Sequence, residues 1–301
     1  MSVLIKDLSK KYGQQLVVDN ISFKAEKGQI TGFLGPNGAG KSTTMKIATC
    51  YIPSTSGSVE IAGLDVNSQS LEVKRKIGYL PEHNPLYLDM YVRESLDFTA
   101  SVYGLKNNSF RIAEVIGQVG LGKEQNKKIG ALSKGYRQRV GLAQAIIHNP
   151  EVLILDEPLT GLDPNQIVEI RSLIKELGKD KTVIFSTHIM QEVQFLCDKV
   201  IIINKGKIVA DKTLADLKNN EGNSKTVYVE FGNSINTETL KDLHGVNEII
   251  FLTANSARIF YKEEHDIRPD LFNWAQQNGN NILSLKAEED TLESIFQKLT
   301  S

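Results

Sequence analysis

One octapeptide, GPNGAGKS at residues 35–42, constrains the fold of this chain more than any other part of its sequence. It follows the apolar run ITGFL and fits the pattern GxxxxGK[ST]. Glycines let the backbone wrap round a phosphate with its N–H groups pointing inward, and a following helix adds partial positive charge. An ordinary Gly-rich turn is the alternative, but the strand-like run and the complete pattern argue against it. We therefore predict a strand, a phosphate-binding loop and a helix beginning at about Lys41.

The motif also predicts which groups contact a nucleotide. Lys41 is expected to face the β- and γ-phosphates of ATP as a point charge, and the Ser42 hydroxyl to face Mg²⁺. The residues expected to contact ATP in this segment are Gly35, Pro36, Asn37, Gly38, Ala39, Gly40, Lys41, Ser42 and Thr43.

A second signal is the run VLILDEP at residues 152–158, in which a buried strand is expected to end in two carboxylates. In nucleotide hydrolases with such a loop, the first acid supports Mg²⁺, so Asp156 takes that role. Glu157 is placed to polarise an attacking water as general base. Acids after a strand are also common as helix caps. The phosphate loop favours the catalytic interpretation, since each motif needs the other to hold Mg·ATP.

A third segment, LSKGYRQR at residues 132–139, lies about twenty residues before the acidic pair. Ser133 is a good N-cap, and Gly135 leaves room for a phosphate against the helix N-terminus. Taken alone, the segment is an ordinary capped helix start.

In context the segment resembles the LSGGQ signature of ABC ATPases. GLDP with Asp163 and TVIFSTH with His188 follow in the order of that family, over residues 1 to about 210. The resemblance implies that Tyr12 in KKYG stacks on adenine, that Asp163 belongs to the D-loop, and that His188 acts with Glu157. It also implies that two such domains pair head to tail, as a homodimer or heterodimer, with Ser133 facing the partner's nucleotide.

The chain is further similar to the drug-exporter and ABC-2 branch, and within it to the ATPase of gliding-motility-associated transporters. That finer resemblance rests on IGYLPEHNPLYLDMYVRESL and on the C-terminal TLESIFQKLT. It implies integral membrane permease subunits in separate chains. Three positions depart from the family pattern. Glu82 replaces a glutamine that faces Mg²⁺, Lys134 replaces a glycine, and Tyr136 replaces a glutamine.

The remaining pattern predicts an α/β fold in two domains. Residues 1–221 form the nucleotide-binding domain, a P-loop fold with a mixed sheet and a helical subdomain at about 85–150. After Pro150 strands and helices alternate, as in a mainly parallel sheet. Residues 222–301 read as βαββαβ plus a helix, a small ferredoxin-like accessory domain.

Composition restricts partners and location. The net charge of -1 gives no electrostatic reason to expect nucleic acid. The first residues lack the basic start and long apolar run of a signal peptide. We therefore expect a cytoplasmic protein, peripheral on the membrane through its permease. The alternatives are an ABC ATPase acting on ribosomes or DNA, whose two-domain or coiled-coil features are not seen here, and a small-molecule kinase.

Overall fold

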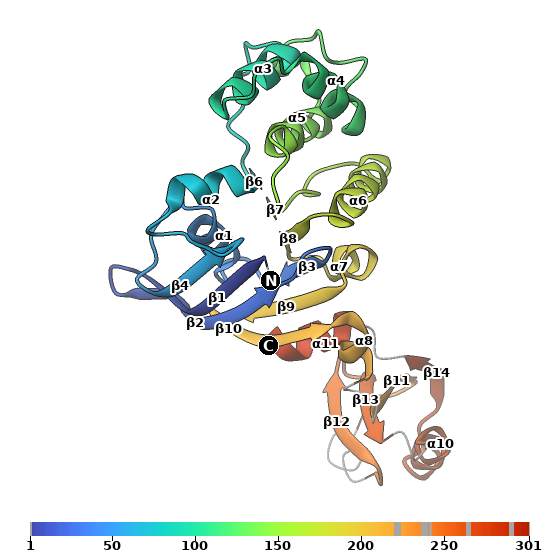
Figure 1. Cartoon of the computed structure of the whole chain (residues 1–301). Helices are drawn as coiled ribbons and strands as arrows, with labels where there is room; N and C mark the ends of the chain where they lie inside the picture. Colours follow the sequence, from blue (N-terminus) through green and yellow to red (C-terminus); the bar gives the residue numbers. More distant parts are fainter. Residues whose placement is uncertain are drawn as a thin grey trace. The chain divides into compact units, whose positions relative to one another are not determined.

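The computed structural model describes residues 2–219, 224–235, 240, 243–262, 266–288 and 292–300. The chain divides into two compact units, Met1–Thr213 with Leu299–Ser301, and Leu214–Lys298 (Figure 1).

A six-stranded sheet is the centre of the first unit. Its strand order is β10-β9-β3-β8-β7-β6. All neighbouring strands are parallel except β10, which pairs antiparallel with β9. Apolar runs such as ITGFL and VLILD are buried along their whole length, which is typical of parallel strands covered on both faces. The strands are β3 (Ile30–Leu34), β6 (Ile77–Leu80), β7 (Val152–Asp156), β8 (Thr182–Thr187), β9 (Lys199–Asn204) and β10 (Lys207–Thr213).

A separate antiparallel sheet, of order β2-β1-β4-β5, faces the first across helix α1 (Lys41–Ala48), which contacts β7 as well as β2 and β4. One apolar core joins both sheets through α1: it includes Ile5 from β1, Met45 from α1 and Ile154 from β7. The strands are β1 (Val3–Tyr12), β2 (Gln15–Ala25), β4 (Ser56–Ile61) and β5 (Leu64–Asp65).

Helices α6 (Pro164–Gly178) and α7 (Met190–Leu196) pack against β8, and α7 also packs against β3. Between β6 and β7 the chain forms a helical segment in which α3, α4 and α5 contact one another, drawn at the top of Figure 1. These helices are α3 (Val92–Val102), α4 (Ser109–Gln118) and α5 (Lys134–Ile146), with a short 3₁₀ turn, η1 (Ile129–Ala131); α2 (Ser70–Lys76) precedes β6.

The second unit contains a four-stranded antiparallel sheet of order β12-β13-β11-β14. This is the strand order of a ferredoxin-like fold. Val227, Ile259 and Trp274 belong to its own apolar core. The elements are α8 (Leu214–Asn219), β11 (Ser224–Phe231), β12 (Val246–Phe251), β13 (Ser256–Lys262), α10 (Arg268–Gln277), β14 (Ile282–Glu288) and α11 (Leu292–Thr300).

The predicted fold class is confirmed, with one addition: the early strands form a sheet of their own beside the six-stranded one. The helix expected at 238–243 lies largely outside the described residues. Within the described ranges, no helix combines the length and apolarity needed to cross a membrane.

We predict that a chain of residues 1–220 folds alone, because every buried member of the joint core lies between Val3 and Ile203. It should unfold in one cooperative transition when heated and followed by circular dichroism. A gradual, non-cooperative loss of signal would contradict an independent first unit.

Candidate functional site

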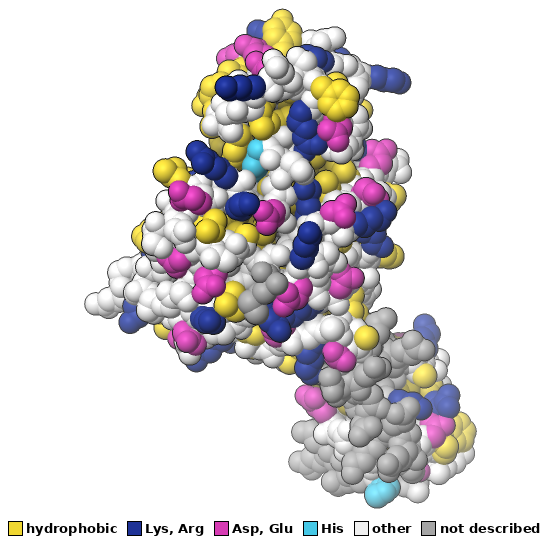
Figure 2. All heavy atoms as spheres, viewed as in Figure 1, with side chains coloured by type: hydrophobic (Ala, Val, Ile, Leu, Met, Phe, Trp, Pro, Cys, Tyr) yellow, Lys and Arg dark blue, Asp and Glu magenta, His cyan; other side chains and the backbone are white. Residues whose placement is uncertain are grey.

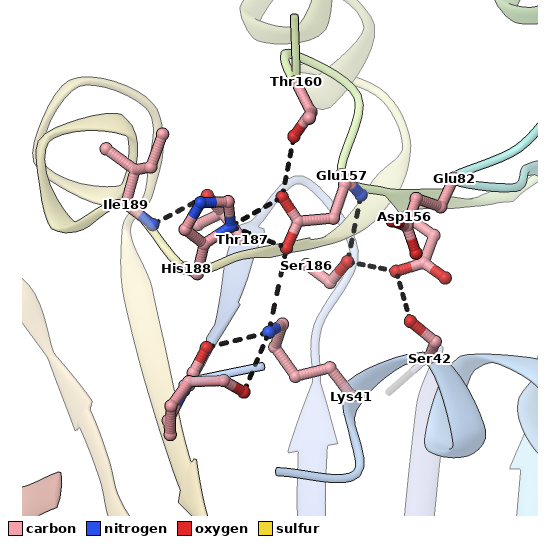
Figure 3. Close-up of polar contacts among 12 residues, drawn as sticks. Lys41, Ser42, Glu82, Asp156, Glu157, Thr160, Ser186, Thr187, His188 and Ile189 are labelled. Carbon is pink, nitrogen blue, oxygen red and sulfur yellow. Dashed lines mark hydrogen bonds and ion pairs between the residues drawn. The ribbon is translucent and has the colours of Figure 1, made fainter. Parts of the chain in front are cut away.

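Four adjacent parallel strands end at the same edge of the six-stranded sheet. The loop 35–40 follows β3, His188 follows β8, Asp156 and Glu157 lie at the end of β7, and Glu82 follows β6. Ligands of open parallel sheets bind at the carboxyl ends of the strands. The topology therefore collects side chains that are far apart in sequence (Figure 3).

The phosphate loop has the backbone that its glycines predict. Gly38 and Gly40 have φ of +81° and +108°, in the left-handed region that disfavours other residues. A Cβ at Gly35 would lie 2.3 Å from the carbonyl oxygen of Ile203, so that position has no room for a side chain. Helix α1 begins at Lys41, as expected. The loop thus forms a cradle at a helix N-terminus, which suits phosphate.

Lys41 is a buried cation, only 6% exposed. Its ammonium donates to the carbonyl oxygens of Gly35 at 2.8 Å and Pro36 at 3.3 Å, and lies 3.7 Å from Oε1 of Glu157. Burial lowers the pKa of Lys41, and the carboxylates of Glu157 and Asp156 partly offset this. The side chain is therefore held at the loop by groups that an incoming phosphate can replace.

Asp156 is buried and accepts hydrogen bonds from Ser42 Oγ, at 3.2 Å, and from Ser186 Oγ. Burial raises the pKa of Asp156, whereas the two hydroxyl donors oppose the rise. Ser42, Asp156 and Glu82 also line one common pocket of about 380 Å³.

These oxygen donors fit Mg²⁺, which proteins usually bind through one or two carboxylates together with substrate phosphates. In the described part of the chain, no group of three or more His, Cys, Asp or Glu side chains is arranged to hold a metal ion. Ser42 and Asp156 would hold the ion directly, and Glu82 borders the same space.

Glu157 has a left-handed backbone, with φ of +51°. Such a conformation costs roughly 1–3 kcal/mol in a non-glycine residue and persists where surrounding contacts enforce it. Here its N–H donates to the carbonyl oxygen and hydroxyl of Ser186, at 3.2 and 3.0 Å. The side chain is only 8% exposed and meets Thr160 Oγ1 at 2.8 Å and His188 Nδ1 at 3.0 Å.

These groups surround a pocket of about 440 Å³. Its walls combine the phosphate loop with both expected catalytic side chains, Glu157 and His188. The lining residues are Val17, Asn37, Gly38, Gly40, Lys41, Ser42, Thr43, Glu82, Glu157, Thr160 and His188. Gly35, Pro36 and Ala39 belong to the loop but do not line the pocket.

Four expected site residues lie outside this pocket. Tyr12, at the end of β1, is 48% exposed, with Lys10 Nζ 5.2 Å from its ring centroid. Ser133 caps α5 by accepting from Tyr136 N at 3.5 Å, and Asp163 caps α6 in the same way, from Gln166 N at 3.0 Å. Gly135 packs against the Gln166 side chain.

The sequence analysis missed two hydroxyl groups. Ser186 bridges Asp156 and Glu157, and Thr160 contacts the Glu157 carboxylate. Thr160 follows Glu157 by only three residues, so a turn after the strand was a usable signal. The approach of Ser186 depends on the pairing of β7 with β8, which no local motif reveals.

Comparisons with known proteins agree with this geometry. A family model described as "ABC transporter" matches residues 18–160. A bacitracin transport ATP-binding protein of Bacillus licheniformis is 38% identical over 305 residues, covering 99% of this chain and 98% of its own. A linearmycin resistance ATP-binding protein of Bacillus subtilis (strain 168) is 34% identical over 301 residues, covering 98% and 97%.

Solved structures give the same result. An ATP-binding subunit of an ABC transporter aligns with a TM-score of 0.68 and 30% identity, covering 74% of this chain and 94% of that one. An ATP-binding cassette in a dimeric post-hydrolysis state, bound to ADP and Pi, aligns with a TM-score of 0.65 and 26% identity, covering 70% and 98%.

We predict that Lys41→Ala weakens ATP binding by about 100-fold, because a charge-assisted contact is worth roughly 3 kcal/mol. Titration calorimetry with ATP and Mg²⁺ measures the change. Lys74→Ala, which removes an exposed lysine from α2, is the matched control and should bind normally. Unchanged affinity in Lys41→Ala would contradict the site.

Proposed function

Because this chain belongs to the ABC transporter family of ATP-binding proteins, we propose that it is the motor of an exporter whose membrane-spanning part is a separate chain. It is an ATPase. The observation that carries the proposal is the buried Lys41 ammonium between the phosphate loop and Glu157, at the edge where Asp156 and His188 also lie. That arrangement suits a γ-phosphate and an attacking water.

In the proposed reaction the loop amides and Lys41 hold the β- and γ-phosphates. Glu157 takes a proton from water, the water oxygen bonds to the γ-phosphorus, and the bond to the bridging oxygen of ADP breaks. His188 holds the Glu157 carboxylate from the side opposite the acidic partner. Mg²⁺, held by Ser42 and Asp156, supplies charge neutralisation at the phosphates.

Pairing of two chains completes the site in this proposal. One chain supplies the phosphate loop, the acids and His188, while its Ser133, Gly135 and Asp163 lie outside the pocket. Ser133 leaves the N-terminus of α5 exposed for an anion. A second copy, or a close relative, placed head to tail would bring these groups to the first chain's nucleotide. Tyr12 would then stack on adenine at the exposed end of β1.

An apolar surface near the site supports coupling to a membrane partner. Tyr87, Leu88, Tyr91, Phe98 and Val102 are all exposed. Tyr87 and Phe98 meet edge to face with ring centroids 6.1 Å apart. Figure 2 shows apolar side chains on the surface over the helical segment, whereas charges of both signs are interspersed below it. We propose that this surface, which continues from Glu82, contacts the permease and holds the chain at the cytoplasmic face of the membrane.

The cargo class follows from the relatives, which match both units of the chain. Their names concern bacitracin transport and linearmycin resistance, and a shorter relative from Streptococcus pyogenes is a lantibiotic transport protein. We propose an amphiphilic export substrate of this kind. A role in gliding motility is the narrower proposal, supported by segment 77–96 and the C-terminal TLESIFQKLT. The second unit is proposed as an accessory domain.

We predict that Glu157→Gln lowers the rate of ATP hydrolysis by about 10² to 10⁴, because a general base contributes that much. ATP affinity should stay within about twofold, since Lys41 and Asp156 remain, and a phosphate-release assay with calorimetry measures both. Glu151→Gln, an exposed acid directly before β7, should hydrolyse normally. Normal hydrolysis by Glu157→Gln would place the base elsewhere.

We also predict that the tagged chain, purified from detergent-solubilised membranes, brings a multi-span protein with it. Replacing two residues of the apolar surface, Phe98→Ser with Val102→Ser, should release that protein and leave ATP affinity unchanged, because neither side chain lines the nucleotide pocket. Retention of the same partner by this double variant would contradict the proposed contact surface.

A further inference from the structure

Three groups hold the Glu157 carboxylate, and the proposed function uses only two of them. Lys41 faces the phosphates and His188 supports the base, whereas Thr160 has no role in that account. We propose, on the basis of the proposed function, that Thr160 is a positioning residue which fixes the oxygen of Glu157 that faces the γ-phosphate.

The distances separate the two carboxylate oxygens. Thr160 Oγ1 donates to Oε2 at 2.8 Å, while Oε1 lies 3.7 Å from the ammonium of Lys41. His188 Nδ1 is nearly equidistant from both, at 3.1 and 3.0 Å, so it does not distinguish them. Figure 3 shows Thr160 and Lys41 approaching the carboxylate from opposite ends.

Binding of ATP changes which of these contacts remain. Lys41 turns to the phosphates, so its hold on Oε1 is lost. The terminal torsion of a glutamate is broad and two-fold, and it gives little intrinsic preference for one orientation. Thr160 then remains as the group that tells one oxygen from the other. With Oε2 bound to Thr160, Oε1 is left free to take the proton of the attacking water.

Thr160 is itself held in place by its loop. Its N–H donates to the carbonyl oxygen of Glu157 at 3.2 Å, forming a tight turn directly after β7. The buried side chain of Gln138, on α5, donates to the carbonyl oxygen of Pro158 at 3.1 Å. Two independent contacts therefore anchor the turn that carries the hydroxyl, and its position does not depend on the nucleotide.

The test is Thr160→Val, which keeps the shape of the side chain and removes the hydroxyl. Thr160 is exposed, so the substitution leaves the core intact. The kcat for ATP should fall by about 10- to 100-fold, the value of a hydrogen bond to a charged group. ATP affinity, measured by calorimetry, should stay within about twofold. Thr160→Ser keeps the hydroxyl and should restore kcat to within about threefold.

Two comparisons make the test specific. Thr253→Val removes a hydroxyl that donates to Asn255 in the second unit, and it should leave kcat unchanged. In single-turnover assays on the Glu157→Gln background, Thr160→Val should add no further loss, because Thr160 acts only through that carboxylate.

An unchanged kcat in Thr160→Val would overturn the inference, as would a full additional loss in the Glu157→Gln background. A low rate in Thr160→Ser would overturn it too. The proposed function fails separately: it is Glu157→Gln with normal hydrolysis that would contradict the base, whatever Thr160→Val does.

Discussion

The site depends on one buried cation. Lys41 is removed from water inside the phosphate loop, where backbone carbonyls and the Glu157 carboxylate surround its ammonium. Taking away one partner of a buried ion pair costs about 3–5 kcal/mol, so an empty loop needs Glu157 as a counter-charge. A γ-phosphate brings negative charge to the same ammonium. Exchange of one anion for another therefore frees the base when its substrate arrives.

The parallel sheet makes this exchange possible. Strands β3, β7 and β8 are adjacent and end at one edge, so Lys41, Glu157 and His188 meet although they are far apart in sequence. The same turn that follows β7 carries Thr160 and leads to Asp163 at the start of α6. Events at the Asp163 end of that turn are thus connected, through few residues, to the orientation of the base.

Sequence reasoning located the elements with high accuracy where chemistry imposes a motif. The glycines of the phosphate loop, the Ser133 cap and the strand ending at Asp156 are local features, and their bounds agree with the structure. Contacts set by strand pairing were beyond its reach. Ser186 touches both acids only because β8 pairs with β7, and the separate sheet arises from the pairing of β1 with β4, about fifty residues later in the chain. Tyr12 and Asp163 are present as expected, but one chain does not bring them to the pocket.

The central claim is that one chain holds half of a site that a second chain completes. The mass of Glu157→Gln, measured by light scattering after size exclusion, tests it most directly. Without turnover, ATP shared between two chains stabilises the pair by mass action. The account predicts a dimer of about twice the 33.4 kDa chain mass in saturating ATP and a monomer without it, and a monomer in both conditions when Ser133→Arg is added. A dimer that forms equally well without ATP, or that survives Ser133→Arg, would contradict it.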